Sequence, residues 1–132
     1  MRKLEWDESV KRWEAHVEAC TVIVREGALK RLELAAEALR QWGNDVEVEG
    51  VTRTESCTGV ILLRAKLTIN GGTADAGYLE FVAAPKSQVI HSEGERRFEK
   101  RRWKKISLTA EAIPGHCDEV IRTFMTWGWV KA

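Results

Sequence analysis

The stretch GVILLRAKLTINGG, residues 59–72, decides the fold class of this chain. Residues 59–69 are rich in β-branched and other apolar side chains, a composition typical of a strand. The Asn70-Gly71-Gly72 segment follows, and Asn-Gly tolerates the positive φ angles that a hairpin turn requires. The next strand is therefore expected to return antiparallel to the first.

Further extended segments lie on both sides of this hairpin. Residues 46–54 alternate with a period of two and predict a strand before it, and residues 78–84 predict the strand that follows it. A short extended piece at 88–91 is expected to lead into an acidic turn at 92–95. A last strand is expected to run through the basic residues that follow and to end near Thr109.

The segment before the sheet has the period of a helix. From Asp7 to Trp42, apolar residues recur every three or four positions, with one extra four-residue step near Gly27. Two alternatives stay open. The helix breaks near Gly27, or it runs on for about 54 Å, longer than the roughly 36 Å diameter of a compact chain of this length. In the second case, another copy of the protein would cover the surplus apolar stripe.

A shorter amphipathic helix is expected over residues 118–127, after a break at Pro114-Gly115. The order predicts a single two-layer α+β domain over residues 1–132: a long or broken N-terminal helix, an antiparallel meander of four to five strands, and a C-terminal helix. The residues expected to form its core are Leu32, Leu39, Ile61, Leu63, Phe81, Leu108, Ile121 and Phe124.

Composition places the chain among globular proteins. Apolar residues make up 44% and charged residues 31%, and no apolar run approaches the roughly 20 residues of a membrane span. The three cysteines, Cys20, Cys57 and Cys117, are odd in number and widely spaced, which favours reduced thiols over a disulfide framework. These features predict a cytoplasmic protein without a membrane partner.

The strongest local charge lies in residues 95–105. Seven Lys or Arg side chains stand there against two Glu, so this segment carries +5 in a chain whose total is +1. Such a block could hold a polyanion, with Trp103 as a stacking platform, or it could keep a sheet edge solvated while Trp103 packs inside. Strand alternation puts Lys104, Ile106 and Leu108 on one face and Trp103 on the other, with Arg101 and Lys105. The polyanion candidates are Arg96, Arg97, Lys100, Arg101, Arg102, Trp103, Lys104 and Lys105.

Six Trp residues are more than one core of this size readily encloses. Aromatic side chains are enriched at interfaces, so some of these residues are expected to line a pocket or a contact surface. The candidates are Trp13, Trp42, Trp127 and Trp129.

Catalytic and metal-binding patterns are weak. His16 and Cys20 share a helical face, which is only half of a zinc site, and we expect neither a metal nor a cofactor. Cys57 could act as a nucleophile with His91 or His116 as a base, but no local signature surrounds it.

We therefore expect a non-enzymatic binding module, a homodimer that holds a protein partner or a small apolar ligand between helix and sheet. Two alternatives remain: nucleic-acid or polyanion binding through residues 96–105, and a small enzyme of unknown chemistry.

Overall fold

The computed structural model describes residues 3–97 and 99–127, which form an α+β arrangement. A long helical segment comes first and consists of α1 (Lys3–Val24), the π-helical turn η1 (Arg25–Leu29) and α2 (Lys30–Gln41). The remaining elements are β1 (Val46–Glu55), β2 (Ile61–Ile69), β3 (Gly77–Ala84), β4 (Val89–Arg96), β5 (Glu99–Ser107) and α3 (Ile113–Thr126). None of the helices in this part of the chain is long and apolar enough to cross a membrane.

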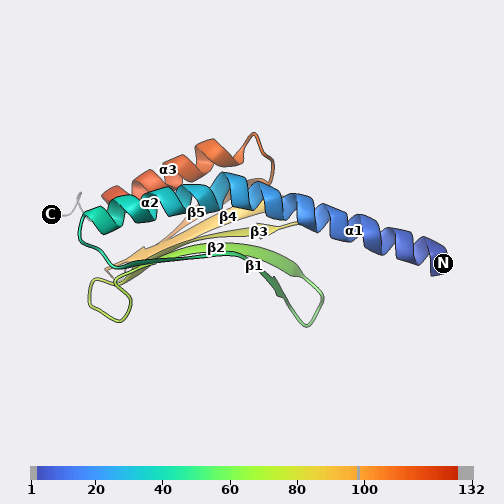
Figure 1. The fold of residues 1–132 in the computed structure, drawn as a ribbon, viewed down its shortest axis with the longest axis horizontal. Coiled ribbons are helices and arrows are strands. Elements are labelled where there is room, and N and C mark those ends of the chain that lie inside the picture. Colours follow the sequence, from blue (N-terminus) through green and yellow to red (C-terminus); the bar gives the residue numbers. More distant parts are fainter. Residues whose placement is uncertain (1–2, 98, 128–132) are drawn as a thin grey trace.

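The five strands form one antiparallel sheet in the order β1-β2-β3-β4-β5, so each strand pairs with its neighbour in sequence. The helical layer covers one face of this sheet, and α3 lies beside α2 in that layer (Figure 1). The N-terminal part of α1 extends past the strands into solvent (Figure 1). β1 and β5 are the two edges of the sheet.

The long helix is continuous, which decides between the two alternatives left open by the sequence. Val24, Ala28 and Leu32 follow one another in steps of four, a spacing that would carry them off the sheet-facing side of an ideal α-helix with 3.6 residues per turn. The wider π-helical turn at Arg25–Leu29 absorbs this drift. All three side chains consequently stay fully buried.

Gly27, inside this turn, lies against the start of α3. A Cβ atom at Gly27 would lie 2.6 Å from Cγ2 of Ile113, the first residue of α3. The missing side chain therefore lets the two helices approach each other.

The buried core lies between the helices and the sheet. Along β2, every second residue from Ile61 to Ile69 is buried, as expected of a strand with one covered face. The predicted core is confirmed, since each of its members has at most 8% of its surface exposed: Leu32, Leu39, Ile61, Leu63, Phe81, Leu108, Ile121 and Phe124.

The acidic turn expected at residues 92–95 is wrong. These residues belong to β4, which continues to Arg96 and turns at Arg97, where φ is +50°. Ser92 and Gly94 look like turn residues but occupy covered positions of the sheet. A Cβ atom at Gly94 would lie 3.3 Å from Leu79, so a small residue suits this tightly packed strand.

The C-terminal helix begins five residues earlier than expected, at Ile113 rather than Asp118. Pro114-Gly115 was expected to be a break before the helix. Proline is instead well placed in the first turn of a helix, where its missing N–H has no intrahelical partner to lose.

Candidate functional site

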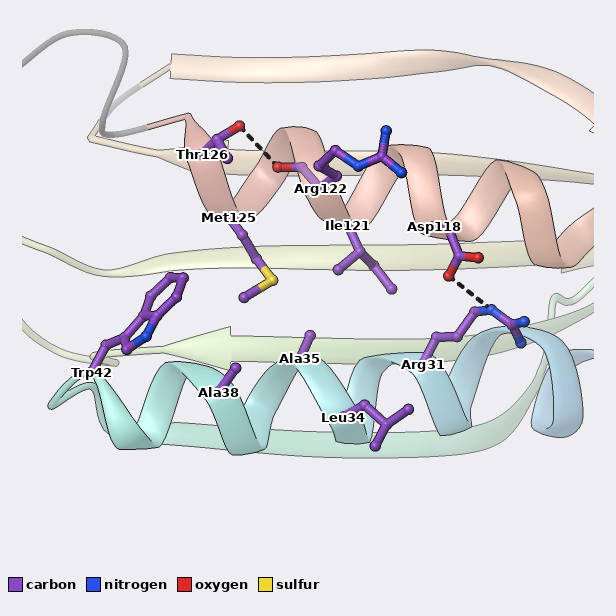
Figure 2. A pocket seen from close by; sticks show the side chains of 10 residues that line it. All are labelled: Arg31, Leu34, Ala35, Ala38, Trp42, Asp118, Ile121, Arg122, Met125 and Thr126. Carbon is purple, nitrogen blue, oxygen red and sulfur yellow. Dashed lines mark hydrogen bonds and ion pairs between the residues drawn. The ribbon is translucent and has the colours of Figure 1, made fainter.

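An apolar groove runs between α2 and α3 on the outer side of the helical layer. It encloses about 510 Å³. In Figure 2, Ala35 and Ala38 of α2 face Ile121 and Met125 of α3 across the groove, and Trp42 stands at one end. The ten residues that line it are Arg31, Leu34, Ala35, Ala38, Trp42, Asp118, Ile121, Arg122, Met125 and Thr126.

The sequence of α2 explains the groove. Leu32, Ala36 and Leu39 point to the sheet and are buried, so the next apolar positions around the helix turn toward α3. Ala35 and Ala38 are small and leave a hollow beside the bulkier Ile121 and Met125. Apolar surface is left open to solvent here, because Leu34 is 73% exposed and Trp42 is 56% exposed.

An ion pair closes the other end of the groove. The Arg31 Nε atom donates to Asp118 Oδ1 at 2.9 Å, and the same guanidinium donates to the Gly27 carbonyl oxygen in the π-helical turn. Arg122 adds a second guanidinium on the α3 side. The lining thus carries two cationic groups and one carboxylate, an excess of positive charge around an apolar floor.

Of the four Trp residues predicted to line a pocket, Trp42 lies in this groove. Trp13 is half-buried on α1 beside His16, with 5.7 Å between the ring centroids. Trp127 is buried, and its Nε1 atom donates to Glu99 Oε2 at 3.0 Å. Trp129 lies outside the described residues.

Of the other groove residues, Ile121 was expected in the core, and none was expected to line a pocket. Leu34 and Ala38 are apolar but lie outside the core-facing stripe of α2, whose residues recur every three or four positions. Their position was the one sequence pattern that indicated a second apolar surface on this helix. The α3 side could not be placed against it from sequence, because helix pairing depends on tertiary packing.

The basic candidates gather along β5, at the edge of the sheet. Lys100, Arg101, Arg102, Lys104 and Lys105 are all exposed, as is Arg97 in the preceding turn. Arg96 differs. Its guanidinium donates to the Phe124 carbonyl oxygen at 3.0 Å and lies 5.3 Å from the centre of the Phe124 ring, and burial lowers its pKa.

The expected alternation of β5 is wrong across a β-bulge. Ile90 pairs with Ile106 and Ser92 pairs with Trp103, so two β5 residues stand opposite the single residue His91. Trp103 and Ile106 consequently both pack against the core. Trp103 is half-buried there and borders a hollow of about 300 Å³ at the sheet edge.

The sheet face opposite the helices carries a network of charges. Glu93 accepts hydrogen bonds from the Tyr78 hydroxyl and from Arg102 Nε at 3.1 Å, and it pairs with Lys100 Nζ at 3.3 Å. These contacts, the Tyr78 hydrogen bond first, lower the pKa of Glu93. Glu93 therefore offsets part of the positive charge on β5.

The three thiols differ in exposure, and one of them contacts an imidazole. Cys57 is exposed, whereas burial raises the pKa of Cys20 and raises that of Cys117 to about 12. His16 Nε2 lies 3.7 Å from Cys20 Sγ and 2.9 Å from the Pro85 carbonyl oxygen. Across residues 3–97 and 99–127, no three His, Cys, Asp or Glu side chains converge as a metal site would require.

Comparison with protein-family models, curated proteins and solved structures found no match for this chain. The groove and the basic edge of the sheet are therefore the features of this chain that bear on its function.

Proposed function

We propose that this chain is a non-enzymatic interaction module, acting as a homodimer, whose α2–α3 groove receives the apolar face of an amphipathic helix from a protein partner. The observation that carries the proposal is the exposed apolar lining of this groove, with Leu34 73% and Trp42 56% exposed. The sequence predicted a ligand site between helix and sheet, whereas the proposed site lies on the outer side of the helices. The inner side is filled by the buried core.

The shape of the groove favours a helix over a small molecule. Small ligands are usually held in sites that bury most of their surface, whereas this groove is open along its length between two helices. Residues 31–41 of α2 span roughly 15 Å, about three helical turns. A helix laid along them could pack its side chains against both α2 and α3, the common helix-in-groove mode of recognition.

The charges beside the groove specify the partner further. Among the residues that line the groove, Arg31 and Arg122 outnumber Asp118. A carboxylate of an incoming helix beside α3 would therefore meet net positive charge, whereas Glu33 and Glu37 lie on the other side of Leu34. Lysine flanks would meet repulsion. Such charge complementarity contributes mainly to specificity and to the association rate.

The test uses two synthetic peptides that place Leu at i, i+3, i+4 and i+7 and differ only in flanking Glu or Lys. Labelled peptide binding is followed by fluorescence anisotropy. We expect the Glu-flanked peptide to bind more tightly, and Ala38→Glu to weaken it by at least about tenfold, or 1.4 kcal/mol, because the new side chain fills the groove and repels the flanks.

Ala19→Glu is the matched control, because Ala19 is exposed on α1 and lies outside the groove. It should bind the Glu-flanked peptide like the wild type. Equal affinity of the wild type and Ala38→Glu for that peptide would remove the groove as the site. Equal affinity for the two peptides would refute the charge argument.

Polyanion binding is the second candidate, supported by five exposed cations in six residues of β5, from Lys100 to Lys105. If three to five phosphates are contacted, the log–log salt slope for an oligonucleotide should be about −2 to −5. Trp103→Ala should lower the midpoint of unfolding, because Trp103 packs against the core. It should not remove oligonucleotide affinity through lost base stacking. Absence of oligonucleotide binding at low salt would exclude this candidate.

A further inference from the structure

A hollow of about 300 Å³ lies beside the bulge of β5, and its lining residues are His91, Glu93, Arg102, Trp103 and Lys105. Glu93 pairs with Arg102 and follows the buried Ser92, so both charged side chains point away from the helices. The volume is at the lower end of the range for small-molecule sites. The hollow shares no lining residue with the α2–α3 groove.

The β-bulge gathers positive charge at this hollow. Lys104 and Lys105 both stand opposite His91, where a regular strand would place one residue. The two lysines are exposed, and neither forms an ion pair with a carboxylate in the part of the chain that the structure describes. The bulge therefore leaves two cations without a counter-ion beside a half-buried imidazole.

The carboxylate that lines the hollow is already engaged. Glu93 accepts hydrogen bonds from the Tyr78 hydroxyl and from Arg102 Nε at 3.1 Å, and it pairs with Lys100 Nζ at 3.3 Å. The charge of Glu93 is thus shared among three donors. An anion that entered the hollow would meet net positive charge from Arg102 and Lys105.

The imidazole of His91 is a further donor that the fold leaves unused. Neither of its ring nitrogens has a hydrogen-bond partner within residues 3–97 and 99–127. Burial lowers the pKa of His91, the charges of Lys105 and Arg64 lower it further, and those of Glu93 and Glu80 act in the opposite direction. A bound anion would stabilise the imidazolium form and so raise this pKa.

We propose that this hollow, the bulge site (His91, Arg102, Trp103 and Lys105), binds the phosphate group of a phosphate monoester. The site goes beyond the proposed groove and does not depend on it. Arg102 and Lys105 supply charge-assisted hydrogen bonds, for which phosphate oxygens are strong acceptors. The half-buried indole of Trp103 provides an apolar wall for the carbon part of the ester.

The donor set favours a phosphate monoester over a carboxylate. A phosphate monoester carries a charge of about −1.5 to −2 at pH 7 and has three strong acceptor oxygens. Three side chains of the bulge site can each donate to one of them: His91, Arg102 and Lys105. A carboxylate offers two oxygens and a single charge.

The test is an NMR titration of the full chain with phenyl phosphate, followed at the imidazole signals. If the imidazolium form binds about tenfold more tightly than the neutral form, saturation raises the pKa of His91 by about one unit. His116 is the internal control, because it contacts Ser92 on the helix side of the sheet. Its pKa should stay constant when sodium chloride holds the ionic strength equal.

Two charge-matched variants locate the site. Lys105→Gln should weaken phenyl phosphate binding by about tenfold, because it removes a hydrogen bond between charged groups. Lys86→Gln removes the same charge from an exposed lysine outside the hollow and should bind like the wild type. Equal affinity of Lys105→Gln and the wild type would overturn the bulge site, as would an unchanged pKa of His91 at saturating phenyl phosphate.

Two single-stranded oligonucleotides that differ only in a 5′-phosphate identify the source of the ester. Tighter binding of the phosphorylated strand would assign the site to the end of a nucleic acid. Equal binding of both strands, with the His91 response to phenyl phosphate retained, would assign it to a small phosphorylated compound. Oligonucleotide binding without any His91 response to phenyl phosphate would keep the polyanion candidate and refute the bulge site.

Discussion

Ser92 and His116 form a buried polar contact between the sheet and α3. Ser92 is fully buried on β4, and its hydroxyl lies 3.1 Å from His116 Nε2. The contact satisfies a polar group that would otherwise cost free energy inside the core. Burial also lowers the pKa of His116, because the charged imidazolium would be poorly solvated there.

This lowered pKa predicts a pH dependence of stability. His91 shares the direction of the shift, with burial as the main cause. The unfolded chain binds protons at these histidines below about pH 6.5, whereas the folded chain resists protonation. The stability they contribute is therefore full above pH 6.5 and is lost as the pH falls through their folded pKa values.

Urea denaturation between neutral pH and about pH 5 measures this loss. Each histidine can contribute at most about 1.4 kcal/mol per pH unit to the slope. His116→Gln should flatten the dependence, since glutamine does not titrate and can still reach Ser92. A wild-type stability that stays constant over this range, or an unchanged slope in His116→Gln, would contradict the argument. The pKa of Glu93 is lowered from 4.5, so the titration of Glu93 affects the stability of the protein only below the pH range of this experiment.

At the scale of elements, the approach of η1 to α3 depends on Gly27. Alanine is favoured over glycine in a helix by about 1 kcal/mol, so Gly27→Ala would stabilise the protein if propensity decided the outcome. The new Cβ would instead lie 2.6 Å from Ile113 Cγ2, which forces the helices apart. We expect a net loss of about 1–3 kcal/mol in the free energy of unfolding, as for other overpacked sites.

Gly115→Ala provides the comparison, because it lies in α3 and a Cβ there meets no atom within 4 Å. This variant should unfold at or above the wild-type midpoint in the same thermal melt. If Gly27→Ala behaved like Gly115→Ala, the close approach would be wrong. Adding Ile113→Ala to Gly27→Ala would relieve the clash but leave a cavity, so full recovery is not expected.

The sequence was informative about elements wherever one face of an element is covered. Alternation predicted β1, and the three-and-four rhythm predicted the long helix, because burial of one face imposes both periods, while a β-rich composition predicted β2. The prediction for β4 was wrong, since Ser92 and Gly94 resemble turn residues. In the folded state the Ser92 hydroxyl contacts His116, and Gly94 leaves room for Leu79. The β5 bulge opposite His91 was not predicted either, because a bulge depends on the partner strand.

For the candidate site, the sequence supplied Trp42 as a pocket candidate, because six Trp residues exceed what one core encloses, whereas Ile121 was expected only as a core residue. The pairing of Ala35 and Ala38 with Ile121 and Met125 arises only when α2 and α3 lie side by side (Figure 2). Such long-range packing leaves no local pattern.

At the scale of the whole molecule, the helical layer offers two separate apolar surfaces. The N-terminal part of α1, with exposed Trp6 and Val10, extends beyond the sheet, whereas α2 and α3, whose residues line the groove, lie side by side toward the other end of the long helix (Figure 1). A homodimer whose interface leaves both grooves open would present two equivalent sites, which increases the avidity for a partner that carries two matching helices.

Methyl chemical shifts during titration with the Glu-flanked peptide test the groove most directly. The account predicts that the largest changes occur at the methyl groups of Ala35, Ala38, Ile121 and Met125, which line the groove. Leu62 and Val82 do not line it and should remain unperturbed. Changes centred on Leu62 and Val82, with the groove methyl groups unmoved, would contradict it.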